Sequence, residues 1–395
     1  MNLNTLKFYQ IGKHPVIRNF DEVFSTPIAP NISILDSWKL CFPDEALELI
    51  IEGTNDKFEE NLGRNKPTNK KEIIKFIASR LYLVSIGEYS YSNHWKKGKG
   101  VKMPTKELKY YRWKALHLNL KCLDLSNLFK ILEDSWIHSI NVGSIVTIDE
   151  LVSGTRTRSP VKVYMPRKPR PNGHLIYLGA IKLNNKYPFV IAAEPFLKKG
   201  GRPTPSKAFI NLCERIFPTI VDFIPQEFMV VCDSAFSTKE VLDYCLKKRI
   251  NFLLSMNKYP SKPLNEILDI NNDWNVGFNP SLNLSILKFN GTNSKKFKLI
   301  TNHFHLNEVE DPIDQENSII RDCYKEYFNS VDLFNKNFYS FRLKLRHFKW
   351  TQVFLDDAIS MAVTNAYALF VASNPSQKIL KKEFIDRLID ELLSF

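Results

Sequence analysis

The stretch GSIVTIDELV, residues 143–152, marks the point at which the sequence changes from helix-forming to strand-forming. Isoleucine and valine are branched at Cβ and are common in strands, so this stretch predicts a β-strand. It carries the acidic pair Asp149 and Glu150. We therefore expect the carboxylate of Asp149 at a fixed position in a sheet.

Strands and helices alternate after this first strand. Further strands are predicted at 174–183, 187–196, 227–236 and 251–258, and helices at 207–224 and 238–250. The order strand-strand-strand-helix-strand-helix-strand is typical of an α/β fold with a mixed sheet flanked by helices.

The rest of the chain divides into helical and irregular segments. Residues 35–143 have apolar residues at a helical period and predict a mainly helical domain. Residues 1–34 show no clear period, and we expect a flexible arm. Residues 259–320 are broken by Pro, Asn and Asp, which favours an insertion, and helical character resumes at residue 321. Residues 373–395 predict a C-terminal amphipathic helix.

Composition bounds the class of protein. The 395 residues are enough for two or three domains, and 44% hydrophobic residues exclude a disordered chain. Lys and Arg number 55 against 42 Asp and Glu, a net charge of +13, which fits a polyanionic partner or simply a basic solvated surface. The six cysteines form no C-x-x-C pair, which argues against disulfides and a local zinc site. No apolar run approaches the length of a membrane span, so no membrane partner is expected.

Two aspartates follow apolar, strand-forming runs. Asp149 lies in IVTIDE and Asp233 in MVVCDS, and adjacent strands would bring them together. Two-metal phosphoryl transfer needs such carboxylates, because the ions lie about 3.5–4 Å apart and prefer hard oxygen ligands. Asp332, in NSVDLF, would approach from a helix. The spacing alone leaves a structural reading open, since many strand-end aspartates are caps or turn formers.

A basic stretch follows the first acid directly. Residues 153–170 contain no acid and six cations: Arg156, Arg158, Lys162, Arg167, Lys168 and Arg170. In a hairpin beside the catalytic strand these side chains would bind DNA phosphates. The structural alternative is an edge strand protected by positive charge.

A second basic run begins after the third acid. It contains Arg342, Lys344, Arg346, Lys349 and Trp350. Arg342, Arg346, Lys349 and Trp350 are candidate DNA-binding residues, although a solvated helix face explains the run equally well.

Three blocks of the sequence resemble piggyBac-type transposases, in order, from about residue 35 to 372. The first block matches at Asp149-Glu150, Tyr164-Met165-Pro166, Lys168-Pro169 and Gly173. The second matches at Asp233, Phe236 and Ser237. The third matches at Val331-Asp332, Arg342, Arg346, Lys349-Trp350 and Asn365-Ala366-Tyr367.

The resemblance implies an RNase H-like catalytic domain formed by residues 144–258 and 321–341, interrupted by the insertion at 259–320. An all-helical domain for dimerisation and DNA binding, residues 35–143 completed by about 342–372, would brace it. Asp149, Asp233 and Asp332 would form the acidic triad that holds two Mg²⁺ or Mn²⁺ ions.

The resemblance also implies the reaction and its partners. Members cut transposon ends, pass through hairpin intermediates and join the ends at TTAA targets. We therefore expect double-stranded DNA as the partner, a homodimer as the assembly and the nucleus as the location.

Two departures from the family qualify these expectations. The family usually carries another Asp three residues after the third acid, where this sequence has Asn335, which we expect to be a weaker metal ligand. No cysteine follows Cys323, so recognition of transposon ends by a Cys-rich zinc module is not expected. The alternatives are a domesticated, non-catalytic DNA-binding protein, and a structural protein that dimerises through its helical domain.

Overall fold

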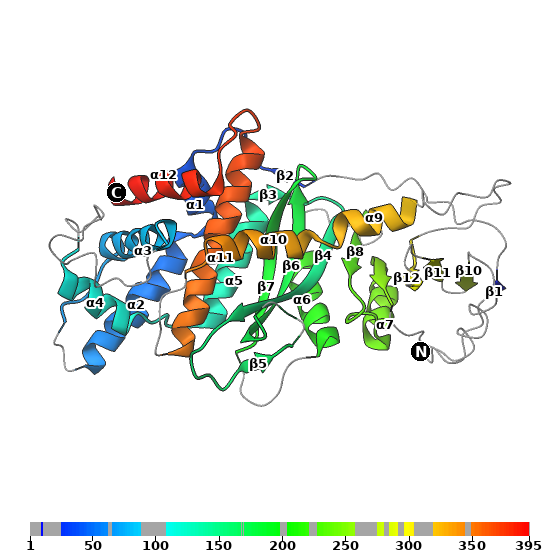
Figure 1. The fold of residues 1–395 in the computed structure, drawn as a ribbon, viewed down its shortest axis with the longest axis horizontal. Helices are drawn as coiled ribbons and strands as arrows, with labels where there is room; N and C mark the ends of the chain where they lie inside the picture. Colours follow the sequence, from blue (N-terminus) through cyan, green and yellow to red (C-terminus); the bar gives the residue numbers. More distant parts are fainter. Residues whose placement is uncertain are drawn as a thin grey trace.

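The computed structural model describes residues 9–10, 25–61, 65–87, 108–166, 168, 170–197, 204–220, 227–256, 275–279, 284–290, 296–303, 319–343 and 349–394. Figure 1 shows three parts in a row: a group of helices, a large sheet covered by helices, and short strands beyond one edge of that sheet.

Five strands form the centre of the sheet. They are β4 (Ile145–Gly154), β6 (Asn172–Leu183), β7 (Tyr187–Pro195), β8 (Met229–Cys232) and β9 (Asn251–Ser255). Their order is β7-β6-β4-β8-β9, in which the first two pairs are antiparallel and the last two are parallel. The apolar run of β8 is buried throughout, as expected for a parallel strand covered on both faces. The predicted mixed sheet flanked by helices is confirmed.

Helices cover both faces of the sheet. They are α6 (Pro205–Thr219), α7 (Lys239–Lys248), α9 (Ile319–Tyr327) and α10 (Ser330–Ser340). Alternate residues of β8 belong to different buried clusters, because side chains alternate along a strand. Val231 packs with Tyr324 of α9, whereas Val230 belongs to the main core with Phe209 of α6.

A tight turn at Asn184, Asn185 and Lys186 joins β6 to β7. Asn184 and Asn185 both have positive φ angles, 51° and 52°. Asparagine tolerates this left-handed conformation better than most residues, and two such residues in succession suit the twist of a hairpin.

The helical group contains helices from both ends of the chain. They are α1 (Ile34–Cys41), α2 (Asp44–Glu60), α3 (Lys70–Ser85), α4 (Tyr110–Asn119), α5 (Leu125–His138) and α12 (Lys381–Ser394). Asn69 caps α3 by accepting a hydrogen bond from the backbone N–H of Glu72 at 3.0 Å. The C-terminal helix α12 packs along α3 and α1, so it completes this helical group.

Helix α11 (Trp350–Ser373) lies between the helical group and the sheet (Figure 1). It packs against α1, α5 and β7. Its 24 residues are long and apolar enough for a membrane span by length and composition, which the sequence reading did not anticipate. However, 94% of its most apolar window is buried inside the protein, which is typical of a core helix.

The end of the predicted flexible arm is anchored to the helical group. Strand β2 (Thr26–Pro27) pairs with β3 (Ile140–Asn141), and the backbone N–H of Asn31 donates to Ser373 O at 3.0 Å. Ile32 is buried. These backbone and apolar contacts attach residues 25–34, within the segment where a flexible arm was expected, to the helical group and to α11.

The predicted insertion contributes strands to the same sheet. Strands β10 (Asn275–Asn279), β11 (Leu284–Asn290) and β12 (Lys296–Thr301) run antiparallel, and β12 pairs with β9. At the far edge, β1 (Tyr9–Gln10) pairs with β10. The described part of the insertion thus extends the central sheet.

Two adjacent aspartates of α11 make buried ion pairs in different directions. Asp356 pairs with Arg80 of α3, and both side chains are 1% exposed or less. Asp357 pairs with Arg342 at 2.6 Å and accepts a hydrogen bond from Ser153 of β4. One turn of α11 is therefore bound to both the helical group and the central strand.

Removing one member of the Arg80–Asp356 pair should destabilise the protein strongly. Asp356→Ala leaves the buried guanidinium without its carboxylate, and breaking such a pair costs about 3–5 kcal/mol. Replacing both partners, as in Arg80→Met with Asp356→Leu, should recover most of this loss. Urea unfolding of the three proteins measures the difference. Equal destabilisation in the single and double variants would contradict the buried pair.

Candidate active site at the ends of the central strands

Asp149 and Asp233 lie at matching positions along two neighbouring parallel strands. In the parallel pair of β4 and β8, Ile148 lies opposite Cys232. Asp149 and Asp233 each come directly after that matched pair, so their backbones are neighbours although 84 positions separate them in sequence (233 − 149).

The two aspartates also belong to the same face of the sheet. Thr147 donates its hydroxyl to the carbonyl of Tyr327 in α9 at 2.8 Å, and Val231 packs in the cluster under α9. Asp149 and Asp233 lie two residues beyond Thr147 and Val231, and alternate residues of a strand share a face. Both carboxylates are therefore expected on the side that carries α9 and α10.

Asp332 approaches this side from the first turn of α10, where it is exposed. Helix α10 packs on β4, and the hydroxyl of Tyr339 donates to Val152 O at 2.5 Å. Burial raises the pKa of Asp233, and the charges of Glu150 and Asp332 raise it further. The structure thus brings the three predicted acids into one electrostatic neighbourhood.

A lysine lies among these acids. The Nζ of Lys168 is 2.9 Å from Oε1 of Glu150. Burial raises the pKa of Asp149 well above its ordinary value, the charge of Glu150 adds to the effect, and Lys168 opposes it. Lys168 was predicted to bind DNA, but here its ammonium balances carboxylates. The sequence signal for this pairing was the acidic doublet together with the basic motif that follows it.

The donor chemistry of the acids fits a hard divalent cation. Asp149, Asp233 and Asp332 offer carboxylate oxygens, which Mg²⁺ prefers. Asn335 lies one helical turn after Asp332, and its buried Oδ1 has no hydrogen-bond partner in the described structure. Within the described residues, no three carboxylate, histidine or cysteine side chains converge closely enough to hold one ion. The oxygens are present, but the ligand geometry is not assembled.

The basic stretch after β4 divides into exposed and packed side chains. Arg156 and Arg158 precede β5 (Lys162–Tyr164), which pairs with β6, and both arginines and Lys162 are exposed. Arg170 instead lies over the ring of Tyr339, 5.3 Å from its centroid. Arg167 falls outside the described residues. Three of the six predicted cations therefore face solvent at the edge of the sheet.

The prediction that Arg342 binds DNA is contradicted by its position. Its side chain is buried, ion-paired with Asp357 and donates to Gly154 O at 2.7 Å. It lies where the chain turns from α10 to α11, and the paired carboxylate comes from α11. Burial of the guanidinium at this turn makes it a structural residue.

The other described members of the second basic run differ in their exposure to solvent. Trp350 opens α11, is half-buried and lies edge-on to His174, with ring centroids 6.3 Å apart, so its placement also favours packing. Lys349 is exposed, and burial together with the charge of Lys57 lowers its pKa. Arg346 lies outside the described residues.

Comparisons with known proteins agree with this architecture. One of the similar solved structures is a cryo-EM structure of a piggyBac transposase synaptic complex with hairpin DNA, with a TM-score of 0.77 and 17% sequence identity. The match covers 94% of this chain and 82% of the other. At this identity the likeness shows a shared fold. No curated protein matches the chain.

A family model described as Transposase IS4 matches residues 36–367. The matched region contains all three predicted acids and most of the helical group. Because it spans most of the chain, the protein belongs to this transposase family, and its resemblance to piggyBac-type transposases is confirmed.

Proposed function

We propose that this protein is a cut-and-paste DNA transposase in which Asp149, Asp233 and Asp332 hold two Mg²⁺ or Mn²⁺ ions. The proposal is supported by the matched ends of two parallel strands at Asp149 and Asp233, by the charge of Asp332 acting on Asp233, and by the chain's membership of the transposase family. Parallel neighbouring strands place two ligands on rigid backbone, as precise phosphoryl transfer requires.

Each side chain of the site has its own role in this proposal. When bound, the ions activate water or a 3′-hydroxyl as nucleophile and stabilise the leaving oxygen. Asp149 and Asp233 position their carboxylates from the sheet, and Asp332 adds a ligand from α10. Lys168 offsets part of the local negative charge, which lowers the repulsion that an incoming phosphate meets.

We extend the proposal to double-stranded DNA at transposon ends and TTAA targets, to a homodimer and to the nucleus. DNA as partner is supported by the exposed Arg156, Arg158 and Lys162, which follow β4 in the chain, and by the net charge of +13. It is also supported by the similar structure, which contains a piggyBac transposase with hairpin DNA.

A non-catalytic, domesticated DNA-binding protein is the second candidate. Asn335 favours it, because a neutral amide stands where the family usually has a fourth acid. Metal-dependent cleavage of DNA separates the two candidates.

Asp149→Asn and Asp233→Asn should each abolish Mg²⁺-dependent cleavage while leaving DNA binding intact. Losing several kcal/mol of metal-mediated stabilisation corresponds to about 10³-fold or more in rate. Cleavage of a labelled duplex with a TTAA-flanked end measures it, and Asp390→Asn, on the exposed face of α12, is the matched control. Full activity in both site variants would overturn the triad.

Asn335→Asp should lower the Mg²⁺ concentration for half-maximal cleavage by about tenfold, the effect of ~1.4 kcal/mol of added attraction. Residue 335 lies one turn from Asp332, so an added carboxylate reaches the same metal. Calorimetric titration with Mg²⁺ provides a readout that does not depend on activity. Superimposable curves would remove Asn335 from the site, and absence of cleavage in both proteins would favour the non-catalytic candidate.

The logarithm of the DNA-binding constant falls linearly with the logarithm of the salt concentration, with a slope of roughly 0.9 per phosphate contact. Replacing Arg156, Arg158 and Lys162 by Ala should therefore reduce the magnitude of this slope by up to about 2.7. Arg342→Ala should instead destabilise the fold and leave the salt slope of the folded protein unchanged, because its guanidinium is buried. Anisotropy titrations and thermal melts measure the two effects. An unchanged slope in the triple variant would show that these cations do not contact DNA.

A further inference from the structure

The two strand-end acids belong to a row that continues onto a third strand, β9. The parallel strands β4, β8 and β9 are in register, with the matched residues Ile148, Cys232 and Leu254. The residues that follow them are Asp149, Asp233 and Ser255, respectively. We call these three residues the three-strand row. Ser255 is its third member.

Ser255 lies on the same face of the sheet as the two acids. Val231 and Leu253 are matched across β8 and β9, and both pack in the apolar cluster under α9. Ser255 lies two residues beyond Leu253, and alternate residues of a strand share a face. Every member of the three-strand row is partly exposed, whereas the matched residues just before them are buried. The hydroxyl of Ser255 is therefore accessible on the side where the acids are expected.

The backbone of Ser255 is held from both sides. Strand β8 pairs with β9 on one side, and β12 of the insertion pairs with it on the other, where Leu299 lies opposite Ser255. The backbone N–H of Met256 donates to Lys298 O at 2.9 Å. Ser255 is thus placed by sheet hydrogen bonds, as Asp149 and Asp233 are, and a strand of the insertion supplies part of this support.

Tyr324 of α9 approaches the three-strand row with its hydroxyl. Its side chain is buried, and its ring stacks on that of Phe328 with centroids 5.0 Å apart. Burial raises the pKa of Tyr324, and a side-chain hydrogen bond with Ser255 partly offsets this rise. The charges of Asp233 and Asp149 raise the pKa further. Tyr324 therefore keeps its proton and holds the Ser255 side chain beside the acids.

We infer that Ser255 is a substrate-positioning residue whose hydroxyl donates a hydrogen bond to a phosphate oxygen of the DNA strand being cut. The inference rests on the proposed function and adds a residue to its site. Neighbouring strands lie about 4.8 Å apart, so Ser255 lies on the order of 5 Å beyond Asp233. A phosphodiester that reaches the acids therefore comes close to this hydroxyl.

The chemistry of Ser255 suits a phosphate better than a metal ion. Serine hydroxyls donate to phosphate oxygens in protein–DNA complexes, whereas hard cations prefer the charged oxygens of carboxylates. Tyr324 can donate its proton to Ser255 Oγ, which leaves the proton of Ser255 free for the phosphate. Tyr324 is thus a positioning residue that acts through Ser255.

Ser255→Ala should lower kcat/KM for Mg²⁺-dependent cleavage by about 10- to 100-fold, the effect of one hydrogen bond to a charged group. Calorimetric titration with Mg²⁺ should give the wild-type curve, because the acids are intact. Ser255→Thr keeps a hydroxyl and should recover most of the rate. The control Ser394→Ala removes an exposed hydroxyl from α12 and should cleave like wild type. Wild-type cleavage by Ser255→Ala, or a weakened Mg²⁺ curve, would overturn the phosphate contact.

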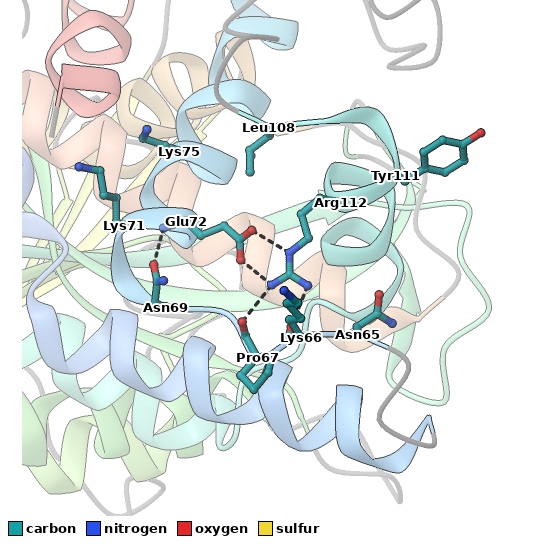
Figure 2. Close-up of a pocket in the computed structure, with 10 residues that line it drawn as sticks. All are labelled: Asn65, Lys66, Pro67, Asn69, Lys71, Glu72, Lys75, Leu108, Tyr111 and Arg112. Carbon is teal, nitrogen blue, oxygen red and sulfur yellow. Dashed lines mark hydrogen bonds and ion pairs between the residues drawn. The ribbon is translucent and has the colours of Figure 1, made fainter.

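Tyr324→Phe should lower kcat/KM by about two- to tenfold, the range of a neutral hydrogen bond. Combined with Ser255→Ala, it should cause no further loss, because Tyr324 acts through Ser255. Tyr111→Phe is the matched control, since this hydroxyl is exposed and points away from the other labelled side chains in Figure 2. Additive losses in the double variant would contradict the coupling, and circular dichroism verifies that each variant is folded.

A binding measurement separates this inference from the proposed function. Duplexes that carry a methylphosphonate at a single phosphate beside the cut lack one phosphate oxygen and its charge. At one such position, the substitution should weaken binding by wild type more than binding by Ser255→Ala. Equal weakening at every position would overturn the contact. A wild type that binds the duplex without cleaving it overturns the proposed catalysis, while this comparison still decides whether Ser255 contacts DNA.

Discussion

The structure depends on the two adjacent aspartates of α11. Asp356 is bound to Arg80 in the helical group, and Asp357 is bound to Arg342 and to Ser153 of the central strand. Buried charges are costly unless they are paired and hydrogen-bonded, so α11 can be buried only when both neighbours are in place. This requirement links the helical group, the sheet and the turn from α10 to α11 in one arrangement.

The third acid depends on this arrangement more than the first two. Asp149 and Asp233 are placed by the backbone hydrogen bonds of neighbouring strands. Asp332 is placed by the packing of α10, which Lys381 of α12 braces by donating to Asn337 O at 2.6 Å. Burial lowers the pKa of Lys381 to about 7. A disturbance in the helical group can therefore reach Asp332 while the sheet remains intact.

Positive charge has two different roles in this chain. Buried cations such as Arg80 and Arg342 hold elements together. Arg80 is matched by Asp356, 276 positions away, and Arg342 by Asp357 of the next helix. Exposed cations such as Arg156, Arg158 and Lys162 face solvent, where a polyanion can reach them. Of the basic residues behind the net charge of +13, only the exposed ones are therefore available to contact DNA.

The amino-acid sequence by itself determined the order of strands and helices and the two strand-end acids, because apolar periodicity and turn residues are local signals. The resemblance of three ordered blocks to piggyBac-type transposases identified Asp332 as the third candidate acid and identified the family. Only the tertiary structure decided that Arg342 is buried, that Lys168 pairs with Glu150, and that strands of the insertion extend the sheet. These features are contacts between distant residues, and burial and pairing depend on which segments meet, which no local pattern specifies.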